Sequence, residues 1–183
     1  MRQCTAYITG SAPYSASRAH CEDELPKETK DAYEERTWRS KAHVLNGSVV
    51  IPPMAFKIGV DRAAKMLARQ IPGKGKSTYT KFFESGVIVT DPVEIAAESE
   101  IKKERIFANA DGIRGSGKRV WRNFPRIDDW KGFVTFHVIA DEITQEIFEE
   151  AVRYAGVAVG VGRFRPERGG YFGRFIVDSF DWD

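Results

Sequence analysis

Alternation of polar and apolar residues marks the first element of the chain. From Gln3 to Thr9, β-forming polar residues alternate with small or apolar ones. A period of two with β-forming residues is typical of a strand. The Gly-Ser-Ala-Pro sequence at residues 10–13 ends the pattern, and residues 14–35 are polar and without a regular period. We therefore expect a strand followed by a long exposed insertion.

Two later segments show the helical period. Over residues 54–70, apolar side chains recur at steps of three and four, with charged residues mostly between them. This pattern predicts an amphipathic helix, and the Pro52-Pro53 pair before it suits a first helical turn. A second apolar stripe over residues 147–155 predicts another helix, capped by Asp141 or Thr144.

Short apolar runs predict the remaining strands. Asn46-Gly47 lies between two such runs and is a strong hairpin signal. Strands are also expected over residues 86–90 and 131–140, and from Phe175 towards Trp182. Residues 118–124 could form a further strand with its turn at Pro125, whereas residues 91–107 are acidic and give no clear pattern.

Without insertions, the order of elements is strand, helix, strand, strand, helix, strand. This order is typical of the split βαβ, or ferredoxin-like, α+β fold, an antiparallel sheet with helices on one face. We expect a single domain over residues 1–183, with insertions at about 10–41 and 91–117. Many RNA-binding proteins with such a sheet use its open face.

Composition and charge narrow the class of protein. Of 183 residues, 42% are hydrophobic, which supports a packed core, and 28 basic against 26 acidic residues leave a net charge of only +2. A nucleic-acid partner must therefore be argued from where the charges lie. No apolar run approaches the ~20 residues of a membrane span, and Met1 to Thr9 does not resemble a signal peptide. We expect a soluble, reduced, cytoplasmic protein with no membrane partner.

Metal and cofactor chemistry is not expected. Two cysteines, Cys4 and Cys21, form no CxxC pair, and His20, His43 and His137 are scattered. No cluster of acids predicts a two-metal site. The sequence therefore predicts no metal site and no cofactor.

The most informative segment is residues 160–175, with five glycines, four arginines and one acid. Glycine lets backbone amides approach phosphate, arginine donates to phosphate in pairs, and aromatic rings stack on bases. The alternative is a surface loop whose arginines only keep it soluble; the density of arginine and aromatic residues favours binding. The predicted nucleic-acid contacts are Arg163, Phe164, Arg165, Arg168, Tyr171 and Arg174.

A second basic cluster runs from Arg114 to Arg126 and contains no acid. If residues 118–124 form a strand, Arg119, Trp121 and Asn123 share one face. An exposed aromatic residue among basic ones would suit single-stranded nucleic acid. Equally, Trp121 could pack in the core, with the charges on an ordinary solvated edge. The predicted contacts here are Lys118, Arg119, Trp121 and Arg122.

The glycine-arginine segment resembles the glycine-rich loop of the RAMP superfamily, the repeat-associated proteins of CRISPR systems. Residues 50–57, Val-Ile-Pro-Pro-Met-Ala-Phe-Lys, resemble the Ile-Pro-Gly-Ser-Ser-Leu-Lys-Gly segment that opens the first helix of that superfamily, with a departure at Pro53 and at residues 55–56. Residues 7–14 are similar to the first strand and loop of backbone-type members. The resemblance implies a ferredoxin-like, RRM-type fold and RNA binding, with Lys57 as a further contact, in a compact or phage-encoded relative.

Weaker candidates remain. Lys74 and Lys76 lie in a glycine-rich loop that does not match a nucleotide-binding P-loop; phosphate contact and a mobile loop are equally favoured. Arg36 and Lys41 follow the acidic stretch 21–35, which favours charge compensation. His20 is a weak candidate for a general base, as in some RAMP-type RNA-processing enzymes.

We therefore expect a non-catalytic protein that binds guide-like single-stranded RNA and belongs to a ribonucleoprotein of antiviral defence, with possible head-to-tail self-assembly. One alternative is a protein-interaction module, such as a phage-encoded CRISPR inhibitor that mimics a subunit. Another is a metal-independent endoribonuclease that uses His20.

Overall fold

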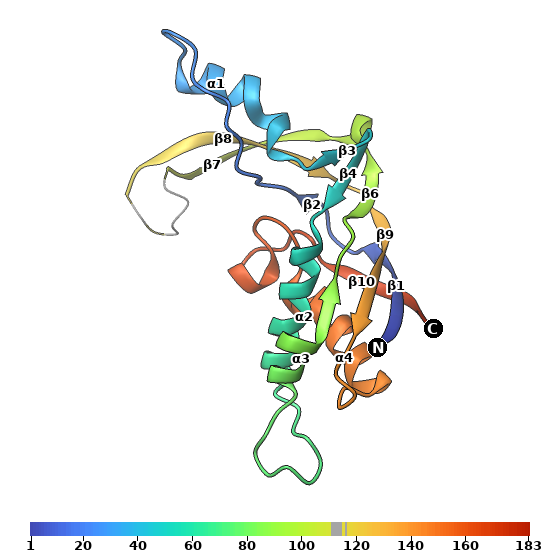
Figure 1. The fold of residues 1–183 in the computed structure, drawn as a ribbon. Helices are drawn as coiled ribbons and strands as arrows, with labels where there is room; N and C mark the ends of the chain where they lie inside the picture. Colours follow the sequence, from blue (N-terminus) through green and yellow to red (C-terminus); the bar gives the residue numbers. More distant parts are fainter. Residues whose placement is uncertain (111–114, 116) are drawn as a thin grey trace.

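A four-stranded antiparallel sheet forms the core of the computed structural model, which describes residues 1–110, 115 and 117–183 (Figure 1). Its strands are β1 (Arg2–Gly10), β5 (Val87–Val89), β9 (Lys131–Val138) and β10 (Phe175–Trp182), in the spatial order β10-β1-β9-β5. The alternation in the first strand has the predicted effect, because Cys4, Ala6 and Ile8 all face the core.

Three helices cover one face of this sheet: α2 (Pro53–Leu67), α3 (Thr80–Gly86) and α4 (Gln145–Tyr154). The predicted amphipathic helix is confirmed as α2, and it ends where Ala68 adopts a left-handed conformation at φ 47°. Thr144, rather than Asp141, caps α4, since its side-chain oxygen accepts from the backbone amide of Ile147. Phe148 of α4 packs edge-on against Phe136 of β9, so helix and sheet share one core.

Two smaller sheets flank the core. The predicted hairpin across Asn46-Gly47 is confirmed as β3 (Val44–Leu45) and β4 (Ser48–Ile51), and β4 also pairs with β6 (Val93–Ala97). The other sheet has the order β2-β8-β7, from β2 (Tyr14–Ser15), β8 (Arg119–Ile127) and β7 (Lys102–Asn109). In Figure 1 the β7–β8 hairpin extends away from the core sheet as a long arm.

Two sequence-based expectations need correction here. The chain does not turn at Pro125, because β8 continues through it to Ile127 and pairs Pro125 with Lys103 of β7. Residues 91–107, which gave no clear pattern, supply β6 and most of β7. Glu94 in β6 and the Lys-Lys-Glu-Arg run that opens β7 lower the apolar signal that strand prediction uses.

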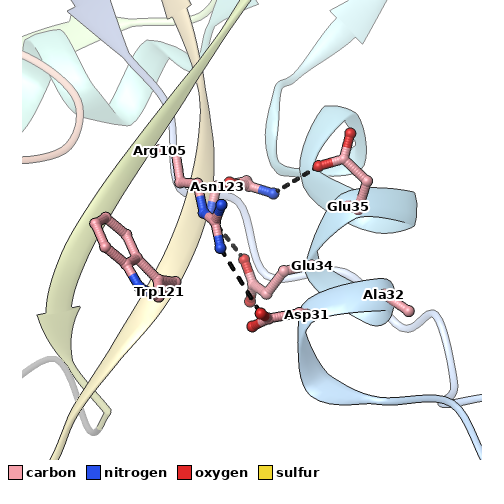
Figure 2. A pocket seen from close by; sticks show the side chains of 7 residues that line it. All are labelled: Asp31, Ala32, Glu34, Glu35, Arg105, Trp121 and Asn123. Carbon is pink, nitrogen blue, oxygen red and sulfur yellow. Dashed lines mark hydrogen bonds and ion pairs between the residues drawn. The ribbon is translucent and has the colours of Figure 1, made fainter.

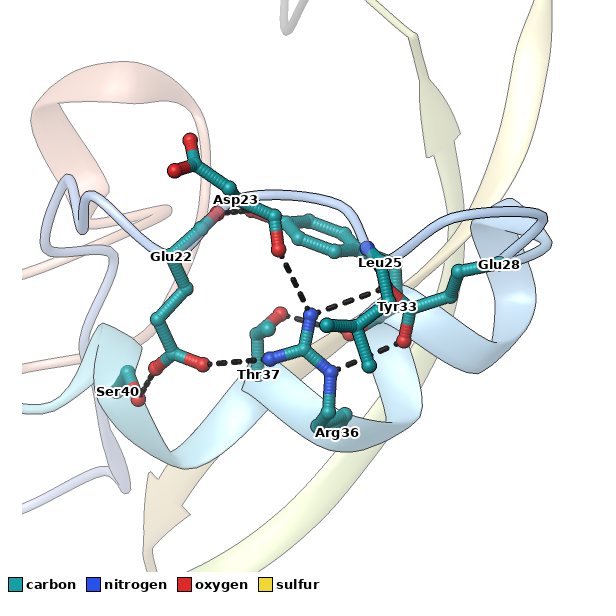
Figure 3. Close-up of polar contacts among 8 residues, drawn as sticks. All are labelled: Glu22, Asp23, Leu25, Glu28, Tyr33, Arg36, Thr37 and Ser40. Carbon is teal, nitrogen blue, oxygen red and sulfur yellow. Dashed lines mark hydrogen bonds and ion pairs between the residues drawn. The ribbon is translucent and has the colours of Figure 1, made fainter.

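The segment after β1 is more ordered than expected. It contains α1 (Lys30–Thr37), which lies against β8 and is followed by a 3₁₀ turn (Trp38–Lys41). Arg36 binds the carboxylates of Glu22 and Glu28 at 3.1 and 3.0 Å and the carbonyl oxygen of Asp23 at 2.9 Å (Figure 3). The charge compensation predicted for Arg36 is therefore present, and it closes the segment on itself.

Within the described part of the chain, no helix has the length and apolar character needed to cross a membrane.

Candidate nucleic-acid interface

The glycines of the 160–175 loop serve close packing. A Cβ atom at Gly170 would lie 1.6 Å from the carbonyl oxygen of Phe164, and one at Gly173 would lie 1.8 Å from that of Val161. Several amides of the loop bond inside it or to its neighbours, including those of Val161, Gly170 and Gly173. The loop is thus a folded unit, and its bonded amides do not form a free cradle for phosphate.

Arg163 anchors this loop to the hairpin. Its side chain is only 10% exposed; its Nη2 donates to Oε2 of Glu104 in β7 at 2.6 Å, and its Nε donates to Oγ of Ser15 at 3.0 Å. The guanidinium also lies 4.0 Å from the ring centroid of Phe124. Burial lowers the pKa of Arg163, although the Glu104 carboxylate opposes that shift. The predicted phosphate contact is instead engaged with protein groups.

Arg165 is also engaged. Its Nη2 lies 3.0 Å from Oε2 of Glu167, and its Nη1 donates to the carbonyl oxygen of Gly162 at 3.2 Å. Glu167 accepts from Arg62 of α2 as well. The single acid of the loop therefore fastens it to the first long helix.

Four predicted contacts remain exposed on this loop. The rings of Phe164 and Tyr171 are 54% and 49% exposed, and Tyr171 stacks on Phe172 with centroids 4.4 Å apart. Arg168 and Arg174 are exposed, and their side chains form no ion pair or hydrogen bond with the described residues. Two unpaired guanidinium groups thus lie in one loop with two exposed rings.

The β7–β8 hairpin carries a second set of exposed rings. Its register places Phe107 directly opposite Trp121, with ring centroids 5.2 Å apart, and both rings are nearly half exposed. The guanidinium of Arg105 lies 4.8 Å from the Trp121 ring, and that of Arg119 lies 4.8 Å from the Phe107 ring. The alternative that Trp121 packs in the core is therefore wrong.

We call this set the hairpin platform: Arg105, Phe107, Arg119 and Trp121. Only Arg119 and Trp121 were predicted from the sequence. Arg119 and Trp121 were predicted to share a face with Asn123, and they do. Arg105 and Phe107 were missed because β7 was not recognised, although they alternate with Glu104 and Ile106. Arg114 lies outside the described residues.

A buried polar cluster joins the hairpin to α1 and the 3₁₀ turn that follows it. Lys41 donates to Oε2 of Glu34 at 2.6 Å and to the carbonyl oxygen of Asn123 at 2.8 Å, and Arg122 donates to Oε1 of Glu34 at 2.6 Å. Burial alone would raise the pKa of Glu34, but the hydrogen bonds from Lys41, the Asn123 amide and Arg122 outweigh it and lower the pKa. Arg122 is thus engaged, whereas Lys118 is exposed.

The three other predicted lysines lie elsewhere. Lys57 donates to Oδ1 of Asp61 at 2.5 Å and to the carbonyl oxygens of Phe83 and Glu84 at 2.9 and 3.0 Å, so its Nζ ties α2 to the end of α3. Lys74 and Lys76 are exposed in the loop between α2 and α3, at the opposite end of the molecule from the hairpin (Figure 1).

Catalytic and metal candidates are few. The ring of His20 stacks on Tyr33 at 6.1 Å, and its Nδ1 is buried without a hydrogen-bond partner among the described residues. These contacts favour packing over proton transfer. Across the described residues, no group of three or more His, Cys, Asp or Glu side chains could hold a metal ion.

The open face of the core sheet differs in character from the loop and hairpin. Its exposed centre contains Tyr7, Phe133 and Ile176. The edge strand β10 adds the exposed carboxylates of Asp178 and Asp181. Carboxylates on this edge make it the less suitable face for a phosphate backbone.

No family model and no curated protein matches the chain. Among solved structures, it is similar to the crystal structure of Cmr6 from Pyrococcus furiosus, with 12% identity, a TM-score of 0.49, and coverage of 97% of this chain and 98% of that one. It is also similar to a chain of a CRISPR RNA-guided surveillance complex, with 9% identity, a TM-score of 0.39, and coverage of 98% and 68%. Likeness at this level does not define a function.

Proposed function

We propose that the protein binds single-stranded RNA without cleaving it, as a subunit of a CRISPR-type ribonucleoprotein. The observation that carries the proposal is the pairing of exposed rings with guanidinium groups on two neighbouring elements. The loop supplies Phe164, Tyr171, Arg168 and Arg174, and the hairpin supplies its platform. Stacking of bases on aromatic rings, with arginine on the backbone, is the usual mode for single strands.

The two elements are held together by fixed contacts, and strand alternation places the anchoring residue Glu104 on the face of the hairpin opposite the platform. The Arg163–Glu104 ion pair joins the loop to β7, and the Arg163 backbone amide donates to the carbonyl oxygen of Ser15 at 2.8 Å. A rigid connection fixes the two sets of rings relative to one another, which lowers the ordering cost for a strand that passes from one face of the hairpin to the other.

The order of the core elements supports the same proposal. The four core strands, with α2 and α4 between them, follow the order strand, helix, strand, strand, helix, strand, and their spatial order supports a ferredoxin-like core. The resemblance of residues 50–57 and 160–175 to the RAMP superfamily points the same way. On this account residues 1–183 are one RAMP-like domain with two insertions.

The test is the salt dependence of RNA affinity. Anisotropy of a labelled 20-nucleotide single-stranded RNA gives the dissociation constant between 50 and 300 mM salt. Each lost phosphate contact reduces the log–log slope by about 0.7 for a single strand. The double variant Arg168→Ala/Arg174→Ala should therefore lower the slope by about 1.4.

A matched control removes two exposed lysines of α2 and α3, through Lys65→Ala/Lys81→Ala. This control makes the same change in net charge away from the loop and should leave the slope nearly unchanged. Equal slopes for the wild type and both double variants would exclude the loop as the phosphate contact. No binding of RNA by the wild type would refute the proposed function.

A further inference from the structure

A cavity lies between α1 and the β7–β8 hairpin. Its volume is about 350 Å³, enough for a nucleobase, and Trp121 of the platform forms one wall. The carboxylates of Asp31 and Glu35 face it from α1 (Figure 2). Asn123 of β8 also lines it. The cavity therefore combines a stacking surface with hydrogen-bonding groups.

The side chain of Arg105 lines this cavity and covers the Trp121 ring, where a base would stack. Its guanidinium lies 4.8 Å from the Trp121 ring centroid, and its Nη2 lies 3.7 Å from Oδ2 of Asp31. Figure 2 shows it between the ring and the acidic helix. Both charged groups of this pair are more than half exposed, so the contact is weak and easily exchanged. A flat group that donates hydrogen bonds is thus the kind of group that fits.

Asn123 adds an unfilled acceptor. The residue is 4% exposed, and its Nδ2 donates to Oε2 of Glu35 at 3.2 Å. That bond fixes the orientation of the amide, because a reversed amide would set its oxygen against a carboxylate. The Oδ1 atom is buried and has no partner among the described residues. A buried acceptor without a donor is costly, so a donor from a ligand would relieve it.

The charges around the cavity tolerate a polyanion. Glu34 is neutralised by Lys41 and Arg122, and Glu35 is paired with Lys103 at 2.6 Å. The carboxylate that remains weakly paired is that of Asp31. The exposed acceptor is therefore Asp31, beside a tryptophan ring, whereas Oδ1 of Asn123 is covered.

We propose that this cavity is a guanine subsite of the RNA surface, an inference that rests on the proposed function. The N1–H and the exocyclic amino group of guanine present two adjacent donors, the same arrangement that the Arg105 guanidinium presents now. Adenine and cytosine place a ring acceptor next to their amino donor, and uracil flanks its N–H with two carbonyl oxygens, so each would set an acceptor against Asp31. Displaced from the ring, Arg105 becomes free to bind phosphate.

The experiment compares labelled 12-nucleotide oligouridylates that carry a single central G, A, C or inosine, together with the all-U strand. Anisotropy is read at one fixed salt concentration. The G strand should bind about tenfold more tightly than the others, the usual discrimination of a bidentate base contact. Inosine lacks the exocyclic amino group and should lose most of the gain without any change to the protein.

Asp31→Asn should abolish the preference for G, so that the G strand binds no more tightly than the all-U strand. Asp23→Asn is the matched control, since Asp23 is an exposed aspartate of the same segment that does not line the cavity. It should keep the preference.

Equal affinity for all five strands, with a steep salt dependence, would overturn the guanine subsite and leave RNA binding standing. A G preference that persists in Asp31→Asn would overturn it too. Absence of binding by every strand would overturn both proposals. If an acetylated Gly-Arg-Gly peptide bound in an Asp31-dependent way while the five strands bound equally, the cavity would be a site for a protein arginine instead.

Discussion

Replacement of Arg163 by methionine separates anchoring from RNA contact. The guanidinium is 10% exposed and its partner Glu104 is 16% exposed, so the substitution leaves a largely buried carboxylate. Arg126, at 3.7 Å from Glu104, is the remaining cation that this carboxylate pairs with among the described residues. Loss of one member of a buried pair costs about 3–5 kcal/mol. Because Arg126 remains and methionine refills part of the volume, we expect a loss of about 2–3 kcal/mol.

Urea denaturation followed by far-UV circular dichroism measures this loss. With an m value of about 2 kcal/mol per M, the midpoint should fall by about 1 M. A second substitution, Glu104→Gln, removes the orphaned charge and should recover part of the loss in the Arg163→Met background, although it destabilises the wild type. A change in stability on Glu104→Gln that has opposite signs in the two backgrounds shows that the two residues are energetically coupled.

The same variant has a predicted result for RNA. Since Arg163 is bound to protein groups, Arg163→Met should leave the salt slope of RNA binding unchanged at temperatures where it is folded. Arg168→Ala should show the reverse pattern, with an unchanged urea midpoint and a slope reduced by about 0.7. The reasoning fails if Arg163→Met keeps the wild-type midpoint and lowers the slope.

Three further predictions follow from buried groups. The pKa of Glu34 is lowered in the folded state, so its contribution to stability is complete above its unfolded pKa of about 4.3 and is lost as pH falls through the lower folded value. Glu34→Gln should therefore be less stable than the wild type at pH 7. Its urea midpoint should also change less than that of the wild type between pH 3 and 7. Burial raises the pKa of Cys4 to about 12, whereas Cys21 is exposed, so a thiol reagent at pH 8 should modify Cys21 and reach Cys4 only after denaturation, as mass spectrometry will show. Gly170→Ala should destabilise by about 2 kcal/mol or more, because its Cβ would collide with a carbonyl oxygen, while Gly59→Ala, with open space at its Cβ in α2, should stabilise by about 0.5–1 kcal/mol; thermal melts compare the two.

Local periodicity was enough to predict most of the core elements, although the short helix α3 was not predicted. The first strand, α2, α4 and the Asn46-Gly47 hairpin all follow from spacing, turn residues or caps that act within a few positions. Local periodicity does not predict contacts between residues that are far apart in the sequence. The strand β7 forms by pairing with β8. Glu34 of α1 pairs with Arg122 and accepts from the Asn123 amide, and both partners lie about 90 positions later in the chain.

The candidate site shows the same limit. Arginine and glycine content identified the 160–175 loop, but content does not say which arginine is free. Arg163 pairs with Glu104, a residue 59 positions away, and Arg165 pairs with its neighbour Glu167. Arg168 and Arg174 have no such partner among the described residues. The sequence therefore predicted a candidate loop, and tertiary contacts divide its residues into anchors and candidate contacts.

The most direct test of the RNA-binding surface is ultraviolet crosslinking of the wild-type protein to a single-stranded RNA, with the crosslinked residues identified by mass spectrometry. Exposed rings that stack on bases are the positions where such crosslinks form. The account predicts crosslinks at Phe107, Trp121, Phe164 and Tyr171. Crosslinks confined to Tyr7 and Phe133 on the open face of the core sheet, or none at all, would contradict it.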